Sequence, residues 1–314
     1  MISAASVKER LKNLSVASGK TLQELLIAYA LERTIYRIAI SNYKEHFILK
    51  GGIFLYALEN GNFSRATSDI DLLAQNISNQ NSAIKSAFID IFSIETDDPL
   101  TYNLQTLTIK NITELKKYHG LNISIISYLD KTRIPISIDI GFGDVIHPDK
   151  ILIDFPVLLP NSNVPKIYAY SIYSCIAEKF EAIVSLGYGN SRFKDFYDIY
   201  IYLSKFDFDG QTLLEAVKET FSYRNTLLND IVAFEDDFAN EPTRKSRWNN
   251  FTKKKKISIQ ISLSEILIEI KSFLLPIINV INTDNLQYNQ TWSHNSKSWL
   301  PKTITPTTHN INKT

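Results

Sequence analysis

The sequence predicts an α+β fold, with a β-sheet core in the middle of the chain and an α-helical half after it. Two observations predict it. Apolar residues recur at helical spacing on both sides of the middle, whereas residues 103–110, 121–129 and 134–142 alternate like half-buried strands. With 314 residues, 44% of them hydrophobic and 21% charged, the chain has an ordinary globular composition. It is long enough for one large domain or two modest ones.

The charge and the cysteine content limit which partners and which cellular compartment the sequence predicts. A net charge of +1 gives no overall attraction to nucleic acid, so any such surface must be local. Cys175 is the only cysteine, which excludes an internal disulfide and fits a reducing compartment. The N-terminus lacks the apolar segment of a secretory signal, and Glu265, Glu269 and Lys271 interrupt the longest apolar stretch. We therefore expect a cytoplasmic protein without a membrane span.

Local signals place the elements of the first half. Thr21-Leu-Gln-Glu24 has the pattern of a capping box, and the apolar spacing that follows predicts a helix over residues 21–40. A helix is expected after Gly51-Gly52, a short strand over residues 66–74 and a further helix over residues 80–94. Three strands follow in the alternating segments described above.

Helical spacing returns in the second half. Helices are predicted over residues 171–186 and 193–206, then after a Thr212–Glu215 cap, and finally over residues 261–276, ending before Pro276. From Asn282 the chain is rich in Asn, Thr and Ser with little periodicity, which predicts a disordered or loosely attached tail. The expected organisation is an N-terminal helical segment (1–45), a core (46–165), a helical domain (166–281) and the tail (282–314).

Two acidic residues stand in the first predicted strand. Residues two apart on a strand share a face, so Asp69 and Asp71 point the same way and Ile70 points into the opposite layer. Carboxylates roughly 7 Å apart on one strand repel unless a cation lies between them. Mg²⁺ prefers such oxygen ligands. A solvated strand end, with Asp71 capping a turn, is the alternative.

A later strand carries a third acid. Ile134, Ile136, Ile138 and Ile140 form one face, which leaves Ser137 and Asp139 on the other. Three carboxylates on neighbouring strands could hold two metal ions for a displacement at phosphorus. The polar face of an edge strand is the other interpretation of Asp139. Upstream, Lys50-Gly51-Gly52 precedes a helix, where glycines let the backbone approach a phosphate.

Together these motifs resemble the minimal nucleotidyltransferase (DNA polymerase β-like) core and, more narrowly, the AbiEii/AbiGii toxin family. The resemblance rests on FILKGGIFLYAL, SRATSDIDLL, ISIDIGFGD, IAEKFEAIVSLGYGNSRFKDFYDIYIYL and Trp248 followed by ISLSEILIEIKSFLLP, and covers about residues 20–276. It implies a mixed β-sheet flanked by helices. By position it implies metal ligation by Asp69, Asp71 and Asp139, and nucleotide contacts by Lys50, Gly51, Gly52 and Lys179, with Asp195 and Asp198 in the motif after the lysine.

Physical reasoning supports Lys179 independently. It lies at the border of the apolar stripe formed by Ile176, Phe180 and Ile183, where a cation can reach a cleft and bind a phosphate oxygen. Asp195 could pair with it, and a purely structural ion pair is the alternative. Arg65 could neutralise the acids or contact phosphate, and a residue without a role in the site is the alternative.

Residues 243–256 contain seven Lys or Arg in 14 residues, with Trp248 and Phe251 between them. Phosphate attraction combined with aromatic stacking is how single-stranded nucleic acids are held. A solvated charge run between helices explains the stretch equally well.

The resemblance predicts an enzyme that uses Mg²⁺ (two ions, with Mn²⁺ as a substitute) to transfer a nucleoside monophosphate from an NTP to an acceptor hydroxyl. It implies a toxin of a toxin–antitoxin or abortive-infection system, a tRNA 3′ end as acceptor and a cognate antitoxin. Transfer to a protein hydroxyl, or an NTP-binding interaction module without catalysis, are the alternatives.

Overall fold

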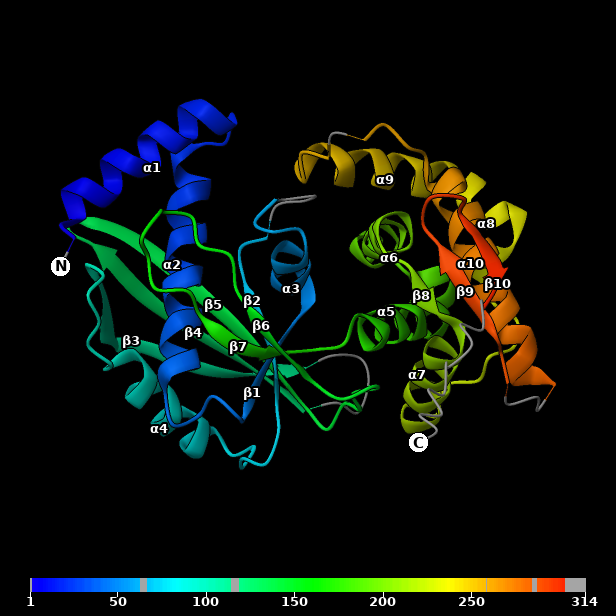
Figure 1. The fold of residues 1–314 in the computed structure, drawn as a ribbon, viewed down its shortest axis with the longest axis horizontal. Helices are drawn as coiled ribbons and strands as arrows, with labels where there is room; N and C mark the ends of the chain where they lie inside the picture. Colours follow the sequence, from blue (N-terminus) through cyan, green and yellow to red (C-terminus); the bar gives the residue numbers. More distant parts are fainter. Residues whose placement is uncertain (1, 63–66, 114–118, 258, 284–286, 303–314) are drawn as a thin grey trace, which may run out of the picture. The chain divides into compact units, whose positions relative to one another are not determined.

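The computed structural model describes residues 2–62, 67–113, 119–257, 259–283 and 287–302 (Figure 1). The chain forms two compact units. The first comprises Met1–Cys175 with Asn249–Gln260, and the second comprises Ile176–Trp248 with Ile261–Thr314. Among the described residues, no helix is long and apolar enough to cross a membrane.

The first unit is built on a seven-stranded mixed sheet, which confirms the predicted α+β class. The strand order is β3-β4-β5-β2-β1-β7-β6. Strand β2 runs parallel to β5 and β1 parallel to β7, and the other neighbours are antiparallel. The strands are β1 (Phe47–Lys50), β2 (Ile70–Ala74), β3 (Leu100–Thr113), β4 (His119–Leu129), β5 (Thr132–Phe142), β6 (Ile151–Asp154) and β7 (Lys166–Ala169).

Four helices accompany this sheet: α1 (Ala4–Ser18), α2 (Leu22–Ile40), α3 (Gly51–Leu58) and α4 (Asn81–Phe92). Helix α2 begins with the predicted capping box, because Thr21 and Glu24 exchange side-chain and backbone hydrogen bonds. It packs against β5 and β7, while α3 packs against β1 and β2. The turn from β1 into α3 therefore lies beside the strand that carries the paired aspartates.

The helical half contains α5 (Ile172–Leu186), α6 (Phe193–Lys205), α7 (Gly210–Tyr223), α8 (Asp236–Asn240), α9 (Pro242–Lys254) and α10 (Leu263–Asn282). Short 3₁₀ turns, Gly187–Gly189 and Val232–Phe234, connect some of them. The start of α7 differs from the prediction, because the side chain of Asp209, rather than Thr212, caps the helix and accepts the N–H of Thr212 at 3.0 Å.

Helix α10 does not end before Pro276, so that prediction is wrong. Proline removes one intrahelical hydrogen bond, but the helix continues to Asn282. Ile277 and Ile278 extend its buried stripe past the proline, with exposed fractions of 0% and 3%. Burial of these side chains offsets the lost hydrogen bond.

The predicted disordered tail is also corrected where it is described. Strands β9 (Gln290–Ser293) and β10 (Ser298–Pro301) form a hairpin that joins β8 (Phe208–Asp209) in a three-stranded sheet. Trp292 is fully buried and donates its indole N–H to the carbonyl of Leu203 at 2.8 Å. Trp299 adds a second anchor, because its indole N–H donates to the carbonyl of Phe273 at 2.9 Å. Two aromatic side chains therefore attach a segment that is otherwise rich in polar residues.

Candidate metal and nucleotide site

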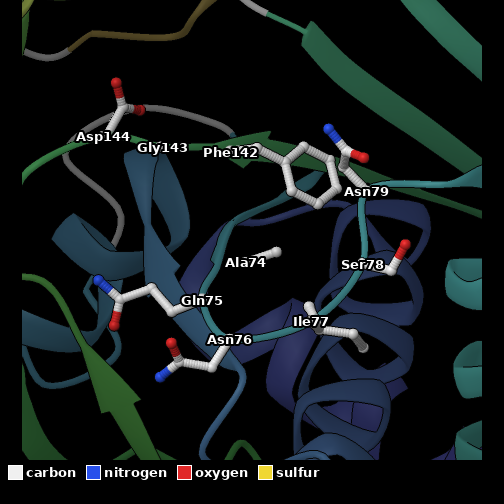
Figure 2. A pocket seen from close by; sticks show the side chains of 9 residues that line it. All are labelled: Ala74, Gln75, Asn76, Ile77, Ser78, Asn79, Phe142, Gly143 and Asp144. Carbon is white, nitrogen blue, oxygen red and sulfur yellow. The ribbon is translucent and has the colours of Figure 1, made fainter.

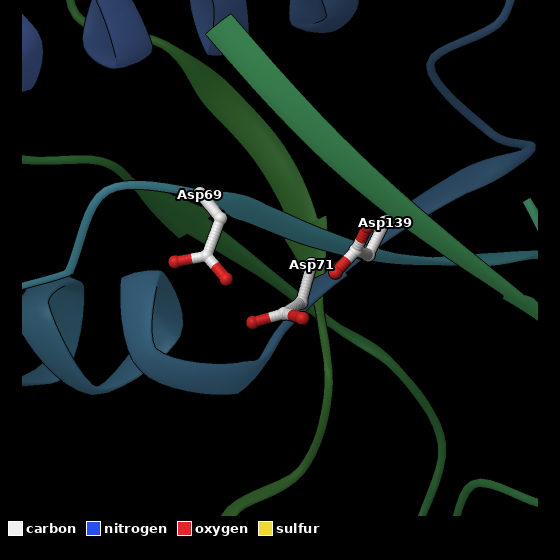
Figure 3. Close-up of side chains that lie close together, drawn as sticks. All are labelled: Asp69, Asp71 and Asp139. Atoms are coloured by element: carbon white, nitrogen blue, oxygen red, sulfur yellow. The ribbon is translucent and has the colours of Figure 1, made fainter. Parts of the chain in front are cut away.

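The sheet of the first unit brings the three predicted acids together. One carboxylate oxygen each from Asp69, Asp71 and Asp139 lies within 4.8 Å of the others, and all three residues are half-buried. Asp69 directly precedes β2, Asp71 is its second residue, and Asp139 is the register partner of Asp71 on β5. Figure 3 shows the three side chains converging from these two strands.

Strand periodicity explains why the acids share one face. Their neighbours Ile70, Leu72, Ile138 and Ile140 point to the opposite face and are at most 1% exposed. Shifting either strand by one residue would move its acidic side chains into the apolar layer and its apolar side chains out of it. The apolar layer therefore holds the carboxylates in place.

Gly51 brings the start of α3 against the acids. Its φ of +68° lies in the left-handed region that favours glycine. A Cβ at Gly51 would lie 1.9 Å from Oδ2 of Asp71, closer than any real contact. Lys50 ends β1 as the register partner of Asp71, so strand pairing itself places this turn at the carboxylates.

Asn122 on β4 is a fourth polar residue at this site, and it was not among the residues predicted from the sequence. It is the register partner of Asp139. Its amide donates to Oδ1 of Asp139 at 2.6 Å and to the hydroxyl of Ser137 at 2.8 Å, and its oxygen accepts from Ser124 at 2.9 Å. An asparagine inside a strand is unusual. The position of this asparagine within a strand was the sequence feature that could have marked it as a site residue. Its partner, Asp139, is apparent only from the register between β4 and β5.

Local hydrogen bonds also support Asp69. The hydroxyl of Thr67 and the backbone N–H of Ser68 each donate to Oδ1 of Asp69 at 3.2 Å. Arg65, predicted to neutralise the acids or contact phosphate, lies outside the described residues.

Lys50 pairs with an acidic residue of the same unit. Its amine forms an ion pair with Asp144 at 2.8 Å and lies 5.1 Å from the ring centroid of Tyr170. A contact between Lys50 and a nucleotide stays a prediction, and it would compete with the Asp144 ion pair.

A hollow of about 630 Å³ opens where β2 and β5 end (Figure 2). Its lining residues are Ala74, Gln75, Asn76, Ile77, Ser78, Asn79, Phe142, Gly143 and Asp144. Apart from Asp144 the lining is uncharged. Asp144 joins the hollow to Lys50, the register partner of Asp71.

Lys179 and Asp195 belong to the second unit, where they form a buried ion network with Asp198. The Lys179 amine lies 3.3 Å from Asp195 and 2.8 Å from Asp198, and neither carboxylate is exposed. Arg192 pairs with Asp195 at 2.7 Å. Because a buried carboxylate without a partner is strongly destabilising, these ion pairs compensate the buried charges where α5 meets α6. The predicted pairing of Lys179 with Asp195 is therefore present, whereas their roles in catalysis stay predictions.

The donor set in the first unit suits a hard divalent cation. Oxygen ligands bind Mg²⁺ at about 2.0–2.1 Å, so two oxygens on one ion lie at most about 4 Å apart. The separation limit of 4.8 Å between the three carboxylate oxygens requires only small adjustments. Because the three carboxylates are half-buried, an ion can reach them from solvent, while fewer water molecules compete with the ion for the carboxylate oxygens.

This combination of mixed sheet, acidic cluster and glycine turn defines a nucleotidyltransferase-type protein. The family model described as "Nucleotidyl transferase AbiEii toxin, Type IV TA system" matches residues 33–261. The chain belongs to this AbiEii family.

Solved structures from Helicobacter pylori resemble the chain at low sequence identity. JHP933 has 14% identity and a TM-score of 0.45, covering 84% of this chain and 95% of its own. A protein described as a proposed nucleotidyltransferase has 16% identity and a TM-score of 0.45, covering 85% of this chain and 99% of its own. A comparison with curated proteins gives no match.

Proposed function

We propose that the chain transfers a nucleoside monophosphate from an NTP to a hydroxyl of an acceptor RNA, the 3′ end of a tRNA. The convergence of Asp69, Asp71 and Asp139 beside Gly51 is the observation that carries this proposal. Membership of a nucleotidyl transferase family supports it.

The reaction forms a bond between the acceptor oxygen and the α-phosphorus and breaks the bond from that phosphorus to the β-phosphate bridging oxygen. Pyrophosphate leaves, and the hydroxyl proton passes to Asp139 or to solvent. Asp69, Asp71 and Asp139 would hold Mg²⁺, two ions in the full proposal, with Mn²⁺ able to substitute. Bound there, the metal neutralises charge on the phosphates.

The chain's own groups would position the reactants. Backbone N–H groups at the start of α3, at Gly51 and Gly52, face the triphosphate in this proposal and add a favourable helix dipole. Lys50, Arg65 and Lys179 are the proposed side-chain contacts to the nucleotide. Asp195 and Asp198 would fix Lys179, since both carboxylates contact its amine. Most of the catalysis would come from positioning and electrostatic stabilisation.

The family's type IV toxin–antitoxin description supports a biological setting. We propose that the protein acts in the cytoplasm as a toxin, that a cognate antitoxin counteracts it, and that modification of tRNA ends arrests growth during phage infection.

The proposal is tested by incubating the protein with each α-³²P-labelled NTP, Mg²⁺ and total RNA. We expect label in the tRNA band that is removed by RNase and resists protease. Label that resists RNase and is removed by protease would instead identify a protein acceptor. If Mg²⁺–NTP raises the melting temperature without any transfer, the chain is a nucleotide-binding module.

A further inference from the structure

The basic stretch in the second half of the chain forms most of α9, a continuous helix over Pro242–Lys254. Arg244 and Trp248 fix one side of this helix. The Arg244 guanidinium donates to the carbonyls of Phe238 and Tyr188 at 2.8 and 2.6 Å. The indole N–H of Trp248 donates to the carbonyl of Ile261 at 3.0 Å. Trp248 is thus a core residue, and the charges beside it stand on an anchored helix.

The other side of α9 is exposed and strongly basic. Lys245, Arg247, Lys253 and Lys254 are all exposed and define what we term the α9 basic face. No described acidic side chain forms an ion pair with any of the four. Residues 242–256 contain seven Lys or Arg and no acid, so the remaining residues carry 1 − 7 = −6. The net charge of the whole chain is therefore close to zero although this one segment is strongly positive.

Helical spacing arranges the exposed groups in rows. Lys245, Asn249 and Lys253 stand four residues apart, which puts them on one side of the helix over about 12 Å. Arg247, Asn250 and Lys254 form another row at spacings of three and four. Each row interleaves cations with an exposed amide that can donate to phosphate or sugar oxygens.

We infer that the α9 basic face binds the sugar–phosphate backbone of the acceptor RNA. This inference rests on the proposed function, because it names the surface that would hold the acceptor. Charge complementarity identifies the occupant: a row of cations about 12 Å long suits a polymer of regularly repeated negative charges. A membrane surface is disfavoured, because an interfacial helix needs an exposed apolar face, and the tryptophan of α9 is buried.

The test replaces Lys245, Arg247, Lys253 and Lys254 with glutamine and measures binding of fluorescent tRNA without NTP across a salt series. Each lost phosphate contact lowers the slope of log K against log [salt] by about 0.7–0.9. We expect the slope to fall by about 3 and the affinity near 0.15 M salt to fall about 10- to 100-fold.

A matched control carries glutamine at four exposed lysines on other elements, Lys12, Lys85, Lys110 and Lys218. It has the same net charge as the α9 variant, so we expect affinity within about twofold of the wild type, since long-range charge effects are screened. Melting temperatures of all proteins are compared first. A Lys253→Gln/Lys254→Gln double variant gives the same comparison if the fourfold variant does not fold.

Equal loss in the α9 variant and the control would overturn the inference, as would unchanged binding in the α9 variant. Absence of tRNA binding by the wild type would overturn it too and would favour an acidic protein partner. Label transfer is measured separately. Selective loss of binding without any transfer by the wild type supports the α9 surface and rejects the proposed function. Transfer of label to RNA by the wild type, together with unchanged binding in the α9 variant, supports the proposed function and rejects the α9 surface.

Discussion

At the scale of single residues, Gly51 controls the approach of the α3 turn to the acidic cluster. The position combines a left-handed backbone with a 1.9 Å conflict between any Cβ and Oδ2 of Asp71. The first constraint acts on the backbone of Gly51 itself, and the second acts on the Asp71 carboxylate. A side chain at this position therefore strains the backbone and also displaces a proposed metal ligand.

We predict that Gly51→Ala destabilises the first unit by about 1–3 kcal/mol, from strain at a positive φ and displacement of Asp71. Nucleotidyl transfer should fall at least tenfold at temperatures where the variant is folded. Gly189→Ala is the control, because a Cβ there meets nothing within 4 Å. Urea unfolding and label transfer measure the two effects, and equal behaviour of both variants would reject this role of Gly51.

Asn122 gives a second prediction, because its amide fixes Oδ1 of Asp139 at 2.6 Å. Groups that orient metal ligands typically contribute 10- to 100-fold to metal affinity. Asn122→Ala should therefore weaken Mn²⁺ binding, measured by electron paramagnetic resonance without NTP, by about tenfold. Ser124→Ala, which removes only the donor to Asn122, should have a smaller effect. Unchanged Mn²⁺ affinity in Asn122→Ala would show that Asp139 does not need this support.

At the scale of elements, the C-terminal hairpin is part of the second unit's core. Trp292 is fully buried, and Phe273 of α10 lies 4.9 Å away between ring centroids. Removing a buried aromatic side chain typically costs about 3–5 kcal/mol. We predict that loss for Trp292→Ala in urea unfolding, whereas Leu300→Ala, at a residue 46% exposed, should cost under about 1 kcal/mol. A small effect of Trp292→Ala would mean that the hairpin is detached in solution.

The helices and strands differ in how far the sequence alone predicts them. The α2 capping box and the alternating face of Ile134–Ile140 depend on neighbours within a few residues, so local patterns were sufficient. The continuation of α10 past Pro276 and the ordering of the tail depend on packing between distant segments. The three acids were predictable from their pattern, whereas Asn122 required the register between β4 and β5.

At the scale of the whole molecule, a buried glutamate makes stability depend on pH. Burial raises the pKa of Glu32 to about 7, opposed by the adjacent Arg33 and the N–H of Leu158. Its ordinary value is 4.5. Since the folded state binds this proton more tightly, the contribution to stability is complete below about pH 4.5 and is lost as pH rises through about 7.

We therefore expect the free energy of unfolding to fall between pH 5 and pH 8 by up to about 3 kcal/mol more in the wild type than in Glu32→Gln. Urea unfolding at both pH values measures the difference. Glu45→Gln, whose side chain is 62% exposed, should keep the wild-type dependence. Parallel pH profiles for the wild type and Glu32→Gln would contradict the assignment to Glu32.

At the same scale, nucleotidyl transfer is proposed to depend on the acidic cluster on β2 and β5. Its most direct test compares label transfer from α-³²P-NTP to RNA by the wild type and by Asp71→Asn, with far-ultraviolet circular dichroism verifying that the variant folds. We predict transfer by the wild type that disappears with EDTA, and at least a thousandfold loss in Asp71→Asn, about 4 kcal/mol of transition-state stabilisation. Wild-type rates in a folded Asp71→Asn protein would contradict it.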